Sequence, residues 1–242
     1  MWLTGFALGL TTSQLMAKDS FTHDEEAKID AVLSRREKGE PLQYIMGEAD
    51  FWGRDFRVGP GVLIPRHDTE TVIRAVMKIF PRDEALTFVD WGTGSGCIAA
   101  TLLMEFPRSF AFMVENSPQA SHYAEENLRR YGLTGRAKLV DDAEGIPPCP
   151  LLVSNPPYIP SGEINGLMRE VRDFEPHSAL DGGPDGKECY REVFALAGRL
   201  GCEWLVLEGG EIPHDENFVL CDTVKDDGGF ARAQTFRRRS GR

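Results

Sequence analysis

The sequence predicts an α/β fold in which a doubly wound parallel sheet follows a short helical segment and a β-hairpin. Strand and helix patterns alternate from about residue 69 onward, which is typical of doubly wound sheets. Apolar residues recur at helical spacing before Gly39, and aromatic and polar residues alternate between Gly47 and Val58. The chain has 242 residues, 41% of them hydrophobic, which is enough for one such domain with a small appendage.

The N-terminal segment predicts two or three short helices between Leu3 and about Arg36. Its apolar residues fall on two faces, Leu3, Phe6, Ala7 and Leu10 on one and Ile29, Val32 and Leu33 on the other. Gly39-Glu40-Pro41 interrupts this pattern, and residues 47–58 suit a hairpin. We therefore expect a helical domain over residues 1–46, a hairpin linker over 47–64 and the main domain over 65–242.

The main domain predicts alternating elements that build a parallel sheet. In order, they are a helix over 69–79, a strand over 87–90, a helix over 98–106, a strand over 111–114, a helix over 118–131, strands over 137–140 and 151–154, a helix over 191–200 and a strand over 204–207. The remaining residues predict edge strands joined by a turn at Gly228-Gly229.

Charge and hydropathy limit the classes of partner. A formal net charge of −11 and a pI near 5.0 would repel a phosphate backbone, which weighs against duplex DNA as the substrate. The basic run Arg237-Arg238-Arg239 with Arg242 is a local exception, which suits either an RNA contact or a solvated end. No apolar stretch approaches the ~20 residues of a membrane span, and Trp2 to Leu10 lacks the flanks of a secretory signal. A cytoplasmic location is therefore expected.

Neither a disulfide framework nor a metal site is predicted. The five cysteines are scattered and form no C-x-x-C pair. The histidines show no paired spacing of the kind that metal ligands adopt.

A glycine-rich run between a predicted strand and a predicted helix indicates a nucleotide-like ligand. The run is Asp90-Trp91-Gly92-Thr93-Gly94-Ser95-Gly96, where glycines let the backbone approach a ligand and helix N–H groups face it. The dinucleotide pattern G-x-G-x-x-G would need glycine where Cys97 stands, so S-adenosylmethionine fits better than a nicotinamide cofactor. Taken alone, the run is equally compatible with any mononucleotide-binding α/β domain.

Two acidic positions at strand ends support the same interpretation. Glu115 ends the second predicted strand, where a carboxylate can accept both ribose hydroxyls, and Asp141-Asp142 ends the third, near an adenine amine. Acids at such positions also serve as simple helix caps.

Asn155-Pro156-Pro157-Tyr158 follows the apolar run at residues 151–154 and suits methyl transfer to a planar nitrogen. The side-chain carbonyl of Asn155 and the backbone carbonyl of Pro156 can accept the two hydrogens of an NH2 group, while Tyr158 stacks on the flat substrate. Pro156 and Pro157 stiffen the loop that holds these acceptors. A proline-rich turn after a buried strand is the plainer interpretation of the same four residues.

Several further motifs stand in register along most of the chain. They are Gly39 to Gly47 as G-E-P-x-x-Y-I-x-G, Phe51-Trp52-Gly53, Phe56-Arg57-Val58, Leu63 to Glu70 as L-I-P-R-x-x-T-E, the glycine run, Asn155 to Tyr158, and then Glu175-Pro176, Ala179-Leu180, Gly182-Gly183 and Asp185-Gly186. Together they resemble the peptide chain release factor glutamine N5-methyltransferases. The resemblance implies a Rossmann-like class I S-adenosylmethionine-dependent methyltransferase sheet with a small, shortened helical N-terminal domain and a connecting β-hairpin.

The resemblance also implies the roles of individual residues. It implies that S-adenosylmethionine is bound by Gly92, Thr93, Gly94, Ser95, Gly96 and Glu115, with Asp142 and the backbone of Ala143 beside adenine and Asn155 as a further contact. Glu115 stands in place of the more usual aspartate, and Ala143 where a larger side chain is common. Asn155, Pro156, Pro157 and Tyr158 would hold a glutamine side chain, with Asn155, Pro156 and Tyr158 as the catalytic group. Arg66, Thr69 and Glu70 would brace the cofactor pocket, or form a latch with Thr69 as a helix cap and Arg66 paired to a carboxylate.

The implied reaction is methylation of the glutamine in the Gly-Gly-Gln loop of a class I peptide chain release factor. The helices before Gly39, expected to contact that partner, are shorter than in the family, and the long helix before the last two strands is missing. Three alternatives remain open: a glutamine methyltransferase acting on a ribosomal protein, an N6-adenine methyltransferase acting on nucleic acid, and a cofactor-binding subunit without activity.

Overall fold

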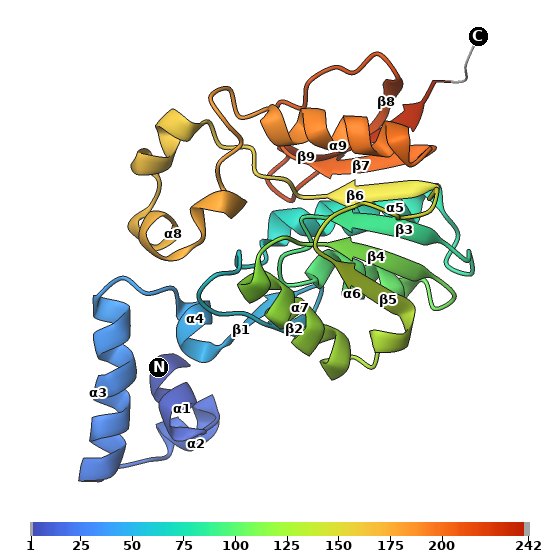
Figure 1. Ribbon diagram of the computed structural model, residues 1–242. Coiled ribbons are helices and arrows are strands. Elements are labelled where there is room, and N and C mark those ends of the chain that lie inside the picture. The colour runs from blue at the N-terminus through green and yellow to red at the C-terminus, as the bar shows by residue number, and fades with distance from the viewer. Residues whose placement is uncertain (1, 240–242) are drawn as a thin grey trace.

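The computed structural model describes residues 2–239, which form a seven-stranded mixed sheet with flanking helices and a separate two-stranded hairpin (Figure 1). The sheet order is β5-β4-β3-β6-β7-β9-β8. The parallel strands are β3 (Thr87–Trp91), β4 (Phe110–Val114), β5 (Ala137–Val140), β6 (Leu151–Ser154) and β7 (Trp204–Glu208). From β3, the strands β4 and β5 extend the sheet in one direction, and β6 and β7 extend it in the other. Ligands bind at such a switch point in open α/β sheets.

The last two strands run antiparallel to the rest. β9 (Ala231–Arg238) pairs with β7, and β8 (Phe218–Lys225) pairs with β9 and forms the edge of the sheet. The prediction of two edge strands was therefore wrong for β9, which is an interior strand, because the last hairpin folds back between β7 and β8. Residues 209–217 contain no helix, as the sequence indicated.

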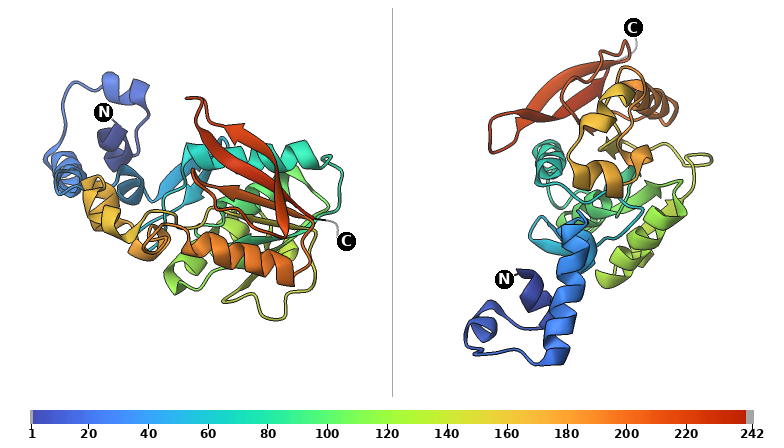
Figure 2. Two further views of the ribbon diagram at one scale, coloured as in Figure 1. Left: turned by 90° about the horizontal axis from the view of Figure 1, so that it is seen from above. Right: turned by 90° about the vertical axis from the view of Figure 1, so that its left-hand side faces the viewer.

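Alternate residues of each strand supply two separate hydrophobic cores. Phe88 and Leu151 belong to the core beneath α5 (Glu70–Ile79), α6 (Cys97–Glu105) and α7 (Pro118–Arg130). Val89 and Leu152 belong to the core beneath α9 (Glu188–Arg199) on the other face. Figure 2 shows α5 and α9 on opposite sides of the sheet. This period of two is inherent in a β-strand. Because β3 to β7 run parallel, their carboxyl ends lie at one edge of the sheet.

The N-terminal helices form a small unit of their own (Figure 1). They are α1 (Trp2–Leu8), α2 (Thr12–Met16), α3 (His23–Glu37) and α4 (Leu42–Met46). Capping boxes begin two of them, formed by Thr11 with Gln14 and by Thr22 with Glu25, so each helix start satisfies its own backbone donors. The first three helices confirm the predicted helical segment, whereas α4 was not predicted.

The hairpin of β1 (Glu48–Phe51) and β2 (Arg54–Arg57) was predicted and connects these helices to the sheet. Trp52 and Gly53 form its two-residue turn, both with positive φ, which matches the twist of a tight hairpin. The buried Asn127 of α7 accepts the Arg57 N–H (2.7 Å) and donates to the Ser95 carbonyl (2.8 Å). Through this one amide the hairpin and the glycine run are fixed to each other.

An insertion between β6 and α9 reaches back to the N-terminal helices. It carries α8 (Arg169–Phe174) and the 3-10 turns Ser161–Gly166 and His177–Ala179. An ion pair joins Arg36 of α3 to Glu170 of α8 (2.6 Å), and Figure 2 shows these segments side by side. The sequence predicted no element here, and α9 begins at Glu188, three residues before its predicted start.

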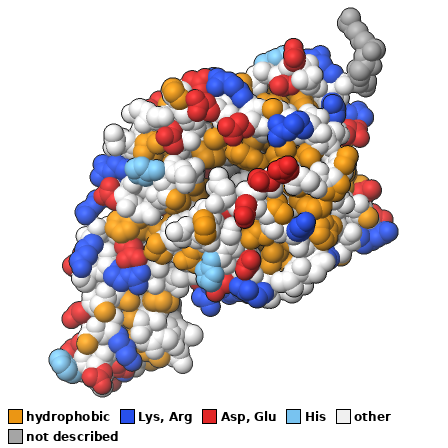
Figure 3. All heavy atoms as spheres, viewed as in Figure 1, with side chains coloured by type: hydrophobic (Ala, Val, Ile, Leu, Met, Phe, Trp, Pro, Cys, Tyr) orange, Lys and Arg blue, Asp and Glu red, His pale blue; other side chains and the backbone are white. Residues whose placement is uncertain are grey.

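The surface gives no sign of an extended basic face in the view of Figure 3, where acidic and basic side chains of the described residues are interspersed. Among residues 2–239, no helix combines the length and the apolar character needed to cross a membrane.

Candidate active site

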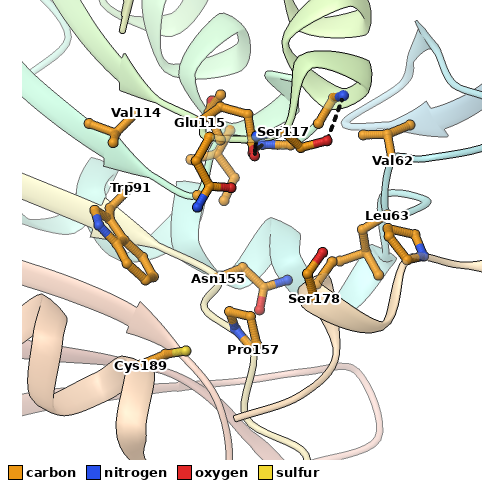
Figure 4. A pocket seen from close by; sticks show the side chains of 18 of the residues that line it. Val62, Leu63, Trp91, Val114, Glu115, Ser117, Asn155, Pro157, Ser178 and Cys189 are labelled. Carbon is orange, nitrogen blue, oxygen red and sulfur yellow. Dashed lines mark hydrogen bonds between the residues drawn. The ribbon is translucent and has the colours of Figure 1, made fainter. Parts of the chain in front are cut away.

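A cavity of about 630 Å³ lies at the carboxyl ends of the central strands, where the topology places a ligand site. Its walls come from the segment before α5, the glycine run, the ends of β4, β5 and β6, the insertion and α9. The residues labelled in Figure 4 include Val62, Leu63, Trp91, Glu115, Asn155, Pro157, Ser178 and Cys189. Glu115 and Asn155 face the same space from the ends of two different strands (Figure 4). The two residues that the sequence assigned to cofactor and substrate therefore share one cavity.

The glycine run is held in place by a buried acid, Asp90. Its Oδ2 atom accepts the Thr93 hydroxyl (2.5 Å) and the Ala99 N–H (3.1 Å), so the run is fastened to the start of α6. Burial raises the pKa of Asp90 to about 7, against the hydrogen bonds from Thr93 and Ala99, which lower it. Its Oδ1 atom has no hydrogen-bond partner within residues 2–239. This carboxyl is structural, because it does not line the cavity.

The glycines are not equivalent. Gly92 and Gly94 line the cavity with left-handed backbones, and at Gly92 the place of a Cβ atom is open space. Gly96 lies behind them as the N-cap of α6, where a Cβ would stand 2.9 Å from Met113 Cε. Ser95 is buried with its carbonyl on Asn127. Gly92, Thr93 and Gly94 are thus the part of the run that a ligand can touch directly.

Glu115 fits the role of a ribose acceptor. Its Oε2 accepts the Gly94 N–H and its Oε1 the Ser117 N–H, both at 2.9 Å, so the carboxylate has a fixed orientation at the cavity wall. Each carboxylate oxygen has a second lone pair that can accept a hydroxyl. A glycine backbone without side chains in the way, beside a fixed carboxylate, suits the nucleoside half of S-adenosylmethionine.

The end of β5 also contributes to the cavity. Asp141, Asp142 and Ala143 line it opposite residues of α9, including Cys189 and Leu196. Asp142 Oδ1 accepts the Glu144 N–H (2.7 Å), which closes a short turn. The predicted adenine position at Asp142 and Ala143 is therefore part of the same cavity as the glycine run.

The loop after β6 places its four predicted residues differently. Asn155 and Pro157 line the cavity, whereas Pro156 is buried and Tyr158 packs against the second core. The Asn155 Nδ2 atom donates to the Thr69 hydroxyl (3.1 Å). The Ser154 hydroxyl donates to the Trp91 carbonyl (2.7 Å), which fixes the end of β6 against β3. The stacking role of Tyr158 stays a prediction.

Arg66 forms the predicted latch. It pairs with Glu175, which is 4% exposed and also accepts the Ile64 N–H (3.2 Å). Burial raises the pKa of Glu175, although Arg66 lowers it. The helix-cap reading of Thr69 was wrong, because its hydroxyl caps nothing and instead meets Asn155. Glu70 accepts the Trp52 N–H (2.9 Å) and so supports the hairpin turn.

Sequence reasoning missed several residues of this site. Trp91, Leu63 and Pro65 line the cavity and stand inside quoted motifs, but no ligand contact was assigned to them. Ser178 and Cys189 also line it and stand outside those motifs. Glu208 is different, because it is an acid at the end of a buried strand, the same signal that identified Glu115. Asp50, His67 and Glu70 bring ligand-type atoms within 4.8 Å of one another at the surface, which their spacing did not indicate.

Comparison with known proteins places this geometry in a family. A release factor glutamine methyltransferase of Moorella thermoacetica is 38% identical over 99% of this chain and 86% of its own length. A release factor glutamine methyltransferase of Geobacter sulfurreducens is 41% identical over 96% of this chain and 86% of its own. The chain belongs to the release factor glutamine methyltransferase family.

Two family models match successive parts of this family member. The PrmC N-terminal domain matches residues 1–47, and the Methyltransferase small domain matches residues 65–170. A third relative, from Koribacter versatilis, is 44% identical over 71% of this chain but only 62% of its own length, so the chain spans less than two thirds of that protein.

Solved structures support the fold. The hMettl16 catalytic domain, in complex with a MAT2A 3′UTR hairpin, gives a TM-score of 0.57 at 14% identity, covering 91% of this chain and 84% of its own. The putative methyltransferase yhhF of Escherichia coli gives 0.52 at 18% identity, covering 81% and 100%. The predicted class I methyltransferase fold, the enzyme class and the use of S-adenosylmethionine are confirmed.

Proposed function

We propose that this chain transfers a methyl group from S-adenosylmethionine to the side-chain amide nitrogen of the glutamine in the Gly-Gly-Gln loop of a class I release factor. Membership of the family supports the reaction and the partner. The reaction would take place in the cytoplasm, where release factors act. The observation that carries the proposal is the amide of Asn155, tied to Thr69 at one end and facing the cavity that contains Glu115 and the glycine run.

The chemistry requires orientation more than proton removal. An amide NH2 is conjugated to its carbonyl and is a poor nucleophile, so its lone pair must be directed at the methyl donor. S-adenosylmethionine supplies, when bound, a methyl group on a positively charged sulfur. In this proposal the Asn155 Oδ1 atom and the Pro156 carbonyl accept the two amide hydrogens, and Glu115 with residues 92–94 holds the nucleoside.

The protein partner would enter over the insertion. Pro176, Ser178 and Ala179 line the cavity on the side opposite the glycine run, and the same insertion reaches α3 through the pair of Arg36 and Glu170. We infer that the N-terminal helices and the insertion together bind the release factor. We also propose that the chain divides into a helical domain over residues 1–46, a hairpin linker over 47–64 and a methyltransferase domain over 65–242. Interspersed surface charge and a net charge of −11 favour this partner over nucleic acid.

The test is methyl transfer in a purified system. The protein is incubated with S-adenosylmethionine and a class I release factor, and peptides are mapped for a mass gain of one methyl group. A methyl on the glutamine of the Gly-Gly-Gln loop is expected, and a release factor with that glutamine replaced by alanine serves as the control. Transfer to the alanine-substituted factor, or no transfer while S-adenosylmethionine still binds, would contradict the proposal.

A further inference from the structure

The side chain of Glu208 is a buried acid that the reaction as described does not use. It ends β7 beside the end of β6, is 2% exposed, and its Oε2 atom has no hydrogen-bond partner within residues 2–239. Its backbone carbonyl accepts the Tyr190 hydroxyl (2.9 Å). Burying an acid without donors is costly, so a carboxyl in this position calls for a partner or a function.

Two hydroxyls face this carboxyl, those of Thr69 and Tyr158. Burial raises the pKa of Glu208 to about 7, while the nearby hydroxyls of Thr69 and Tyr158 lower it, although within residues 2–239 neither hydroxyl forms a hydrogen bond with the carboxyl group in this structure. Such bonds are often long without substrate and shorten in the complex. The titratable and charged groups around Glu208 are Asp68 before α5, Cys97 of α6, Tyr158 after β6, Tyr190 of α9 and Arg232 of β9.

The direction of the hydrogen bonds follows from the chemistry of each group. An ionised carboxylate can only accept, so a hydrogen bond that forms between Thr69 and Glu208 in the substrate complex requires Thr69 to donate its hydroxyl proton. The Thr69 oxygen is then left as an acceptor, and it receives the Asn155 Nδ2 hydrogen at 3.1 Å. The amide of Asn155 therefore has one allowed orientation, with Nδ2 on Thr69 and Oδ1 kept for the substrate.

We propose that Glu208 is a positioning residue, whose carboxylate orients Thr69 and Tyr158. Through Thr69 it determines that the Oδ1 end of the Asn155 amide, and not the Nδ2 end, meets the substrate. The inference rests on the proposed amide methylation. It adds that Glu208 keeps the Asn155 Oδ1 atom free to accept a hydrogen of the substrate amide. Protonation of Glu208 would let it donate to Thr69, which releases the constraint on Asn155. Turnover therefore depends on the ionised form and falls as the pH drops through the pKa of Glu208.

The test compares Glu208→Gln with Thr69→Ser and Thr69→Val, measuring kcat and KM for the release factor from about pH 5.5 to about pH 9. Glutamine keeps the shape but can donate to Thr69, so Glu208→Gln should lower kcat on the order of 10-fold to 100-fold and lose the acid limb of the wild-type profile. Thr69→Val should lower kcat similarly, and Thr69→Ser should retain it within about threefold. The affinity for S-adenosylmethionine should stay the same in all three.

A second readout needs no substrate. In the spectrum of the ¹⁵N-labelled protein with S-adenosylmethionine, the Asn155 side-chain NH2 resonances, assigned from an Asn155→Asp sample, should titrate in the wild type and not in Glu208→Gln. A wild-type acid limb and titration that persist in Glu208→Gln would overturn the inference, as would equal loss of kcat in Thr69→Ser and Thr69→Val. Failure of the release factor reaction itself appears in the wild-type assay, and the titration then still decides the role of Glu208.

Discussion

Within residues 2–239 the Asn155 Nδ2 atom donates a hydrogen bond to the Thr69 hydroxyl, and Asn155 is the most informative single residue to replace. Replacing it with alanine removes the acceptor that the proposed reaction uses at the reacting nitrogen. We expect Asn155→Ala to lower kcat on the order of 100-fold or more, as loss of one aligned hydrogen-bonding group in a catalytic site commonly does. Single-turnover methyl transfer measures this loss, and calorimetry should show nearly the same affinity for S-adenosylmethionine.

Asn217 provides the matched control, because it is an exposed asparagine in the loop before β8. Asn217→Ala makes the same chemical change away from the cavity and should retain wild-type turnover. Equal turnover in Asn155→Ala and Asn217→Ala would remove Asn155 from the mechanism.

The sequence predicted that Glu115 and Asn155 lie at a ligand site, but it did not predict which side chains support that site. Glu115 and Asn155 stand at the ends of strands, where position alone indicates a ligand contact, and both line the cavity. The partners of Thr69 and Arg66 could not be predicted, since they lie 86 and 109 residues away along the chain. A one-dimensional pattern contains no information on which distant carboxyl or amide a side chain will meet.

The start of α6 is the element on which the cofactor site depends. Gly96, its N-cap, has φ of 78°, and an added Cβ would stand 2.9 Å from Met113 Cε and 3.4 Å from Ala124 Cα. We expect Gly96→Ala to lower the free energy of unfolding by at least about 1–2 kcal/mol from the backbone strain alone. Urea unfolding measures the change, and the affinity for S-adenosylmethionine should fall with it.

Gly198 of α9 serves as the comparison. It lies inside a helix, and nothing stands within 4 Å of the place that a Cβ would occupy. Gly198→Ala should therefore raise the stability by about 0.5–1 kcal/mol, through helix propensity. If both substitutions shift the unfolding midpoint in the same direction, the close packing behind Gly96 does not control this element.

Elements with a clear period were predicted within a few residues, and those without one were not. The central strands are short apolar runs, α5 and α7 carry an apolar face, and α6 follows the glycine run, so both type and place were defined. α8 is only six residues long and has no buried residue, so it leaves no apolar pattern to detect. The position of β9 between β7 and β8 is set by pairing between strands, which their sequences do not encode separately.

The contact between the N-terminal helices and the insertion can be tested by exchanging the charges of Arg36 and Glu170. Arg36 and Glu170 are both partly exposed, so their ion pair adds little to stability. We expect Arg36→Glu to raise KM for the release factor severalfold, because like charges separate the two surfaces that we infer receive it. The double variant Arg36→Glu/Glu170→Arg should restore KM, whereas kcat should change little in either. A wild-type KM in Arg36→Glu would show that this contact does not shape the docking surface.

The pH dependence of folding also belongs to the whole molecule. The pKa of Asp90 is raised from an ordinary value near 3.8 to about 7, so between these values the folded protein holds a proton that the unfolded chain has lost. The contribution of Asp90 to stability therefore declines as the pH rises from about 4 to about 7. Asn at this position carries no charge, so the stability of Asp90→Asn relative to wild type should increase over that range. Urea unfolding at several pH values measures the difference, and a pH-independent difference would contradict the assignment.

The six residues from Ile64 to Thr69 connect Glu175 of the insertion to Asn155 after β6. Ile64 and Arg66 are fastened to Glu175 of the insertion, and Thr69 to Asn155. A protein that binds residues 161–179 and displaces Glu175 would therefore also displace the Asn155 amide, because residues 64–69 contact both. In the proposed reaction, a release factor bound at the insertion would in this way alter the position of the Asn155 amide, and free glutamine that does not contact the insertion would not.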